Sequence, residues 1–329
     1  MDLSTHLSGN GTMVAYGAKK VSALGLTSSN TLNGSFEIGM EGTLICLAEE
    51  RSPLACTYAN CHSITISGTS LITVVRNENN NRAIDCMDGL TLKNNANVIA
   101  VQECESSWGA IGTALISVND STLTAYSRNS AVQKGGGGTH SDEGYFKVFN
   151  SRISAAAENH DVSLNLDANN MGHFPSVTVE GDSSVVHLYG SKYAITPRSG
   201  TDRDTRESRW TPINLSDGLK LYSANGLSEK YADVTDQLGT QDRSLKVFRP
   251  QMLITKGSSG SEEAKRVYAE IPSITVEEPV PGKKPAQPVV TGSSWTAPIP
   301  APTISTPSAP EEMWSSTCTS TTPWLQNRA

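Results

Sequence analysis

The stretch that indicates the fold reads Ile64-Thr65-Ile66-Ser67-Gly68-Thr69-Ser70-Leu71-Ile72-Thr73-Val74. Two short runs in it alternate apolar and polar residues, and a period of two residues is the signal of a β-strand. The small and polar residues between the runs tolerate tight turns. One copy of the pattern therefore predicts two short strands joined by a tight turn.

The same pattern recurs along the chain at a nearly constant step. When the second apolar residue of each copy is taken as its anchor, successive anchors lie 28, 26, 26, 30 and 31 residues apart. A third short apolar run closes each unit. Three short strands in a unit of this length are typical of one coil of a β-solenoid, whose stacked coils bury a continuous core. The anchors, which we expect to form one internal ladder, are Ile38, Ile66, Leu92, Val118, Val148 and Val179.

We therefore predict an all-β fold, a right-handed parallel β-helix (β-solenoid) of about six to seven coils, with a disordered Pro/Ser/Thr-rich C-terminal tail. Residues 1–34 would be an N-terminal cap or an atypical first coil, residues 35–250 the β-helix domain, and residues 251–329 an extended linker or stalk. Eleven of the sixteen prolines lie at or after Pro272. Such a segment has too few large apolar residues to pack a core of its own.

The end of the β-helix is expected to be irregular. The runs Ile213–Leu215 and Leu219–Tyr222 resemble a degenerate last coil, and Leu245–Phe248 is a further strand candidate. At the turns of earlier coils, Asn94, Asn95, Asn119 and Asn150 recur one coil apart, which predicts a ladder of side-chain hydrogen bonds.

Composition excludes several classes of protein. The formal net charge is −7, and lysine and arginine do not gather on one segment as they do in nucleic-acid binders. No run of 18 apolar residues exists, so we predict no transmembrane segment. Residues 1–30 lack a signal peptide. By analogy with other long β-solenoids, we expect an extracellular or cell-surface location with the signal peptide absent from this chain; the alternative is cytoplasmic.

The six cysteines match no zinc signature. Their simplest interpretation is that of buried, small apolar residues. Cys56 and Cys86 fall in the third runs of successive coils, so a disulfide between them stays an open alternative.

The coils resemble those of bacterial surface proteins described as carbohydrate-binding-domain-containing, which occur in Gram-positive gut bacteria. The segments that carry the resemblance are Ile64–Gly68, the run Ala83-Ile84-Asp85-Cys86-Met87-Asp88-Gly89-Leu90-Thr91-Leu92, and the closing Gly218–Tyr222 and Ser244–Val247. It covers about residues 35–250. It implies a right-handed parallel β-helix that binds carbohydrate, and it transfers no catalytic residue.

Carbohydrate recognition commonly uses aromatic rings beside carboxylates and amides. The residues that we predict to bind such a ligand are Trp108, Tyr126, Tyr145, Asp85 and Asp88. We predict no catalytic residue, no metal site and no cofactor. Calcium would be the metal to consider, because lyases of this fold pair it with carboxylates, but no motif here supports it.

The predicted role is a secreted or surface-displayed binding or adhesion module, with a glycan or another cell-surface ligand as its partner. A polysaccharide lyase or glycoside hydrolase of the pectin-lyase-like fold is the enzymatic alternative, although the paired carboxylates of the hydrolases are not found. A structural spacer and a phage-tail-fibre-like protein are two further alternatives. A tail fibre would be a trimer, whereas we expect a monomer.

Overall fold

The computed structural model describes residues 5–17, 21–26, 34–56, 61–76, 81–86, 88–104, 108–134, 145–157, 162–165, 176–190, 193–195, 213–216, 218–225, 231–238, 250–256, 273–275 and 289–291. Its regular structure in these ranges consists of β-strands and one short 3₁₀ helix. The predicted all-β class is therefore confirmed.

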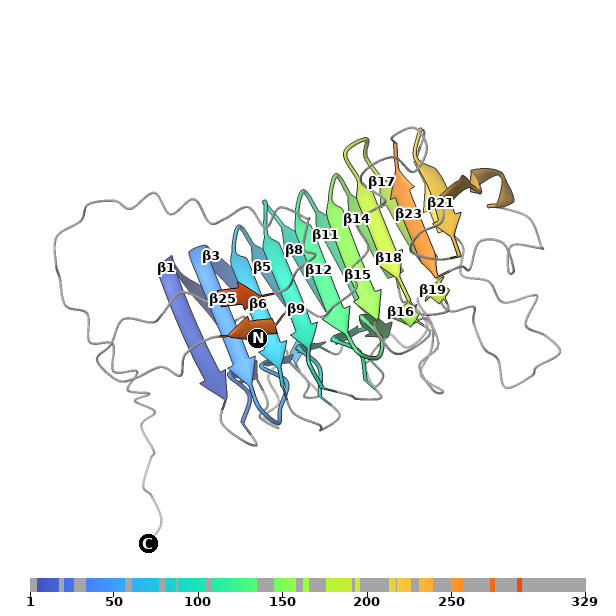
Figure 1. Ribbon diagram of the computed structural model, residues 1–329. Coiled ribbons are helices and arrows are strands. Elements are labelled where there is room, and N and C mark those ends of the chain that lie inside the picture. Colours follow the sequence, from blue (N-terminus) through green and yellow to red (C-terminus); the bar gives the residue numbers. More distant parts are fainter. Residues whose placement is uncertain are drawn as a thin grey trace, which may run out of the picture. The chain divides into compact units, whose positions relative to one another are not determined.

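The strands stack side by side in successive coils (Figure 1). One sheet of 16 strands contains the first and second strands of the coils, and a second sheet of seven strands contains the third. Seven stacked third strands agree with the six to seven coils predicted. The strands of this second sheet are β2 (Leu24–Leu26), β4 (Leu54–Cys56), β7 (Ile84–Cys86), β10 (Ile111–Thr113), β13 (Val132–Lys134), β16 (Val162–Asn165) and β19 (Tyr193–Ile195).

The large sheet begins with two long strands that each cover two sides of a coil. These are β1 (Thr5–Gly17) and β3 (Gly34–Ala48), which pair in parallel along the whole of β1. From the third coil onward, a turn splits the long strand into two. The resulting pairs are β5 (Cys61–Ser67) and β6 (Ser70–Val75), β8 (Gly89–Lys93) and β9 (Asn97–Gln102), β11 (Leu115–Asn119) and β12 (Thr122–Ser127), β14 (Tyr145–Phe149) and β15 (Arg152–Ala157), and β17 (Ser176–Glu180) and β18 (Val185–Tyr189).

The predicted internal ladder is confirmed in every step. Ile38 pairs with Ile66, and the register continues through Leu92, Val118, Val148 and Val179 to Leu215. From Ile38 to Val179, each anchor is at most 1% exposed. The anchors are buried because each coil covers the apolar face of its neighbour, which no single coil can do alone.

The turns between the first and second strands are joined by a ladder of hydroxyl groups. The backbone N–H of Ser121 donates to Oγ of Ser151 at 3.0 Å, and the N–H of Ser151 donates to Oγ of Ser184 at 3.4 Å. The same turns contain residues with positive φ, including Asn94, Asn95 and Asn150. The repeated asparagines thus permit the tight turn, whereas serine and threonine hydroxyls supply most of the bonds between coils.

Replacing Ser151 by alanine should lower the free energy of unfolding by about 1–3 kcal/mol, because the buried N–H of Ser121 loses its acceptor. Urea unfolding followed by circular dichroism measures this change. Ser183→Ala is the matched control: its hydroxyl lies in the equivalent turn but is exposed, and its partner Asn150 can bond to water instead. Equal effects of the two variants would contradict a role for buried hydroxyl groups.

The last coil differs from the prediction. The strand β20 (Ile213–Leu215) adds to β17 in parallel, as expected. However, β21 (Lys220–Ala224) does not stack on β18, because β23 (Gln251–Thr255) lies between them and pairs antiparallel with both. Met252 and Ile254 of β23 point into the core, so this strand extends the inner ladder. These five residues lie within the segment predicted to be an extended stalk.

Other predictions for the C-terminal region have a mixed outcome. The strand candidate Leu245–Phe248 lies outside the described residues, and so does most of residues 251–329, the predicted stalk and tail. Within the predicted stalk, β24 (Ser273–Thr275) and β25 (Val289–Thr291) form an antiparallel pair.

Candidate functional site

Two of the residues predicted from the sequence, Asp85 and Trp108, lie close together on the outside of the seven-stranded sheet. Arg82 lies between them: its Nη1 donates to Oδ1 of Asp85 at 2.7 Å, and its Cζ lies 4.4 Å from the centre of the Trp108 ring. Trp108 is 38% exposed. Asp88 lies only two residues after β7 and is buried. We call Arg82, Asp85, Trp108 and the neighbouring Gln133 the Trp108 site.

The coil architecture brings this site together from three successive coils. In the outward-facing ladder of the short sheet, Asp85 pairs with Gly112, which pairs with Gln133. Trp108 precedes β10, in the coil between those of Asp85 and Gln133. Because the register stacks equivalent positions about 4.8 Å apart, residues that are distant in the sequence become neighbours on one face.

Two glycines of the site leave room for neighbouring groups that a Cβ atom would displace. A Cβ atom at Gly112 would overlap the side chain of Arg82, so the arginine crosses the sheet directly over this residue. A Cβ at Gly109 would come within 2.6 Å of the carbonyl oxygen of Ser130. The N–H of Gly109 also donates to Oε1 of Gln133 at 3.0 Å, which connects the Trp108 turn to the next coil.

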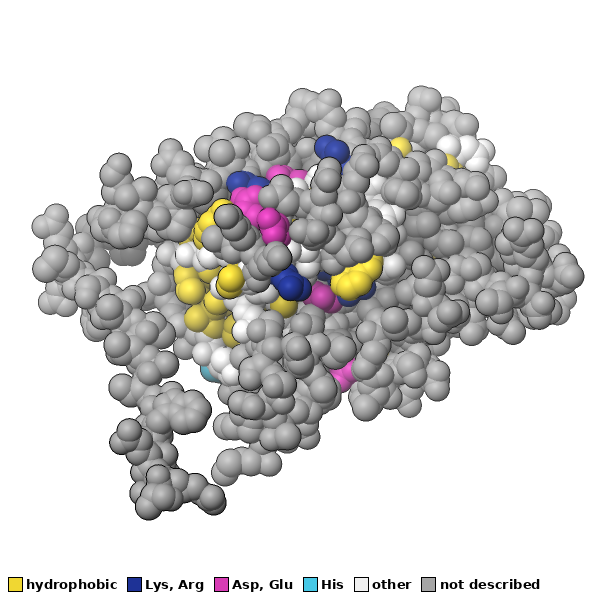
Figure 2. Space-filling model, turned by 90° about the horizontal axis from the view of Figure 1, so that it is seen from below, with side chains coloured by type: hydrophobic (Ala, Val, Ile, Leu, Met, Phe, Trp, Pro, Cys, Tyr) yellow, Lys and Arg dark blue, Asp and Glu magenta, His cyan; other side chains and the backbone are white. Residues whose placement is uncertain are grey.

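The charges of the site are largely compensated within it. The side chains of Arg82 and Asp85 are only 11% and 14% exposed, and each lies against its opposite charge. The backbone N–H of Arg82 donates to Oγ of Ser52 at 3.1 Å, which anchors the arginine to the preceding coil. Described hydrophobic, basic and acidic side chains also lie next to one another on the face seen from below in Figure 2. The arrangement suits recognition of a polar ligand that presents one apolar face.

The two tyrosines predicted to bind ligand are not part of this site. Tyr126, predicted to bind ligand, is 1% exposed and lies among apolar residues of the other sheet, so its ring is not presented at the surface. Tyr145 is half-buried at the start of β14, with Nζ of Lys147 4.5 Å from its ring centre. Trp108 lies before the third strand of its coil, whereas Tyr145 pairs with Leu115 after the following corner.

Arg82 and Gln133 are not among the residues predicted from the sequence. Gln133 directly follows the apolar Val132 of a third strand. Its position one ladder step from Gly112 is the signal that would have identified it. Arg82 precedes its strand, and only the stacked structure shows that it reaches Trp108 of the next coil.

The disulfide between Cys56 and Cys86, left as an alternative by the sequence, is not formed, and Cys46, Cys86 and Cys104 are buried thiols, as the simpler interpretation expects. Cys56 and Cys86 are direct neighbours in the ladder, yet Cys86 is a buried free thiol. Cys56 is disulfide-bonded, so its partner is a cysteine other than Cys86. Burial raises the pKa of Cys86 to about 12, which makes this thiol a poor nucleophile.

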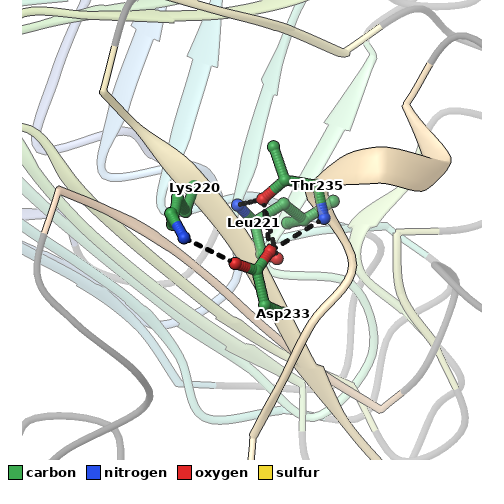
Figure 3. Close-up of polar contacts among 4 residues, drawn as sticks. All are labelled: Lys220, Leu221, Asp233 and Thr235. Atoms are coloured by element: carbon green, nitrogen blue, oxygen red, sulfur yellow. Dashed lines mark hydrogen bonds and ion pairs between the residues drawn. The ribbon is translucent and has the colours of Figure 1, made fainter.

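A second polar cluster closes the end of the large sheet (Figure 3). Asp233 of β22 (Ala232–Asp233) accepts from Oγ1 of Thr235 at 2.6 Å and from Nζ of Lys220 at 2.9 Å. These bonds hold the pKa of Asp233 at about 2. Oγ1 of Thr235, in the 3₁₀ helix Thr235–Gln237, accepts from the N–H of Leu221 at 2.9 Å. The cluster therefore supplies a hydrogen-bond acceptor for a backbone N–H group of β21, which is a structural role.

A third cluster lies on the outer face of β18 and β23. Oη of Tyr231 donates to Oε1 of Gln251 at 2.6 Å and lies 3.1 Å from Nε2 of His187. Because the phenol proton is used for Gln251, His187 donates to Tyr231 through an Nε2–H tautomer. Burial lowers the pKa of His187 to about 4, so the imidazole is neutral at physiological pH. His187 alternates with the inward-facing Val186 and Leu188, and neighbouring groups cover its outward side chain.

A comparison of the chain with known protein families, curated proteins and solved structures finds no match. Within the described part of the chain, no helix has the length and hydropathy needed to cross a membrane. The same residues contain no group of three or more His, Cys, Asp or Glu side chains arranged to hold a metal ion.

Proposed function

We propose that this β-solenoid is a carbohydrate-binding module displayed outside the cell, and that the Trp108 site is where it contacts the ligand. The observation that carries the proposal is the exposed Trp108 ring held against Arg82, beside Asp85, on a rigid outward ladder. Tryptophan and arginine are the residues that most often dominate binding energy at protein surfaces.

The chemistry of the site fits a sugar ring. An indole offers an apolar surface with a negative quadrupole, against which the C–H groups of a pyranose can stack. Asp85 and Gln133 add carboxylate and amide groups for hydroxyl recognition within the same ladder. The arginine is already neutralised and anchored, so little conformational entropy would be lost when a ligand binds.

The disulfide at Cys56 supports an extracellular location. Disulfides form and persist in oxidising compartments and are uncommon in the cytosol. The resemblance to bacterial surface proteins of the carbohydrate-binding-domain-containing type points the same way.

The test is a glycan array on the full-length protein, followed by titration calorimetry with each glycan that binds. Trp108→Ala should weaken binding by about 2 kcal/mol or more, which is roughly 30-fold in Kd. Phe149→Ala is a matched control, because Phe149 is a similarly exposed aromatic residue (42% against 38%) on the large sheet. Unchanged binding in Trp108→Ala, or an equal loss in both variants, would reject the Trp108 site.

The same preparation distinguishes the alternatives. Release of unsaturated or reducing sugars from pectin, alginate or glycosaminoglycans would show that the protein is an enzyme and not only a binding module. Light scattering that gives a trimer mass would favour a fibre protein. A monomer that binds no glycan would favour a structural spacer.

A further inference from the structure

The second strands of the coils have an unusual outer face. Eight apolar residues on it are between 0% and 8% exposed, although they do not belong to the core inside the coils. We call them the outer stripe: Ile45, Leu47, Ile72, Val74, Ile99, Val101, Tyr126 and Ala156.

Their orientation follows from strand alternation. Leu44 and Cys46 belong to the inner core, whereas Ile45 and Leu47 form part of a separate cluster. The register then stacks Ile45 on Ile72, and Ile72 on Ile99. Successive side chains of a strand point to opposite faces, so the outer stripe faces away from the core.

The sequence of these strands contrasts with that of the first strands. In β8, Leu90 and Leu92 alternate with polar residues, and the outward Thr91 is half-buried. By comparison, β9 reads Asn97-Val98-Ile99-Ala100-Val101-Gln102, with a continuous apolar run at its centre. Strands with uninterrupted apolar runs are typical of sheets that are covered on both faces.

A layer outside the sheet must produce this burial. Neighbouring strands cover the flanks of an outward side chain but leave its tip open to solvent. The described residues that pack against the margins of the stripe are Val14, Tyr16 and Tyr189, and all three belong to strands of the same sheet. Exposures such as 0% for Val74 and Val101 therefore require a further segment on top of the sheet.

The strands β24 and β25 have the properties of such a segment. They form a two-stranded antiparallel pair that belongs to neither sheet of the solenoid. An isolated pair of this kind is at best marginally stable in water and needs a surface to pack on. Its register opposes the apolar Ile274 to the apolar Val290 and the polar Ser273 to the polar Thr291, so an apolar cross-strand pair lies next to a polar one.

The connection is long enough. From Thr255 at the end of β23 to Ser273 the chain advances 18 residues, which can span about 60 Å when extended. In the sheet order, β23 is separated from β3 by six strand spacings, or about 29 Å. Every position along the outer stripe is therefore within reach of β24.

We propose that β24 and β25 pack as a ribbon across the outer stripe and shield it from water. The solenoid then has two unlike outer faces. The second strands are covered by the protein's own C-terminal region, and the short sheet that carries the Trp108 site is the face used for ligands.

Covalent footprinting with mass spectrometry tests this on the full-length protein. Ile274→Asp combined with Val290→Asp replaces the apolar cross-strand pair of the ribbon by two charges, and labelling of the outer stripe should rise severalfold. Ser273→Asp combined with Thr291→Asp is the matched control, because the same two strands receive the same charges at the neighbouring polar pair. The control should leave the labelling unchanged, and inner residues such as Ile66 should stay protected in both variants.

Several results would overturn the proposal. One is strong labelling of the stripe in the unmodified protein, and another is an unchanged stripe in the Ile274→Asp, Val290→Asp variant. Protection that depends on protein concentration, together with a dimer mass in light scattering, would assign the stripe to a second copy of the chain.

A reciprocal measurement does not depend on the ribbon variants. Val101→Asp should release the ribbon and accelerate tryptic cleavage at Lys265, Arg266, Lys283 and Lys284, with circular dichroism confirming that the β-helix persists. Thr91→Asp, on the outward face of β8, should leave cleavage unchanged. Equal cleavage rates in the two variants would also overturn the proposal.

Discussion

Ile66→Asp should prevent the stack from folding. Ile66 is fully buried between Ile38 and Leu92, so the substituted carboxylate would face apolar side chains of two neighbouring coils. An uncompensated buried charge costs about 3–5 kcal/mol, a large part of the stability of an ordinary domain. Because each coil is stabilised by its neighbours, the defect interrupts the core on both sides. Soluble yield and urea unfolding followed by circular dichroism measure the loss.

Thr65→Asp provides the control one residue away. Thr65 is half-buried on the outward face and pairs with Glu37 and Thr91. The added carboxylate meets one like charge across the strands, so the loss should stay within about 1 kcal/mol. Comparable losses in the two variants would contradict the inward ladder of anchors.

Acidification should destabilise the protein through His187. The folded pKa is about 4 and the ordinary value is 6.5, so the unfolded chain binds a proton in this window while the folded chain does not. The stability from neutral His187 is fully present above about pH 6.5 and is lost as the pH falls toward 4. The total loss is about 3 kcal/mol, at 1.4 kcal/mol for each pKa unit of difference. Urea unfolding at a series of pH values across the window gives the slope.

His187→Gln isolates this contribution. Glutamine can still donate to Tyr231 but does not titrate, so the variant should lack the His187 part of the slope. The difference between the two pH profiles removes the contribution of carboxylates that titrate in the same range. Parallel profiles would show that His187 is solvated and titrates normally.

The sequence alone determined the register of the coils. The anchors recur at steps that vary only from 26 to 31 residues, and a strand shifted by one residue would turn its apolar side chains outward. The burial of Ile38, Ile66 and Leu92 could therefore be predicted without coordinates. Trp108 was identifiable because no packing requirement explained a tryptophan in a turn.

Other features were decided only by the tertiary structure, because they depend on contacts between distant segments. Gln251–Thr255 pairs antiparallel in the large sheet with strands that are more than 20 residues away in the sequence. The run is short and directly follows a proline, so the sequence pattern does not identify it as a strand of the sheet. The contact between Arg82 and Trp108 exists because stacking brings neighbouring coils within side-chain reach. Tyr126 was a candidate for ligand binding in the sequence, but its ring is buried in the fold. The period of two residues specifies which face of the sheet a residue occupies, and it does not specify what covers that face.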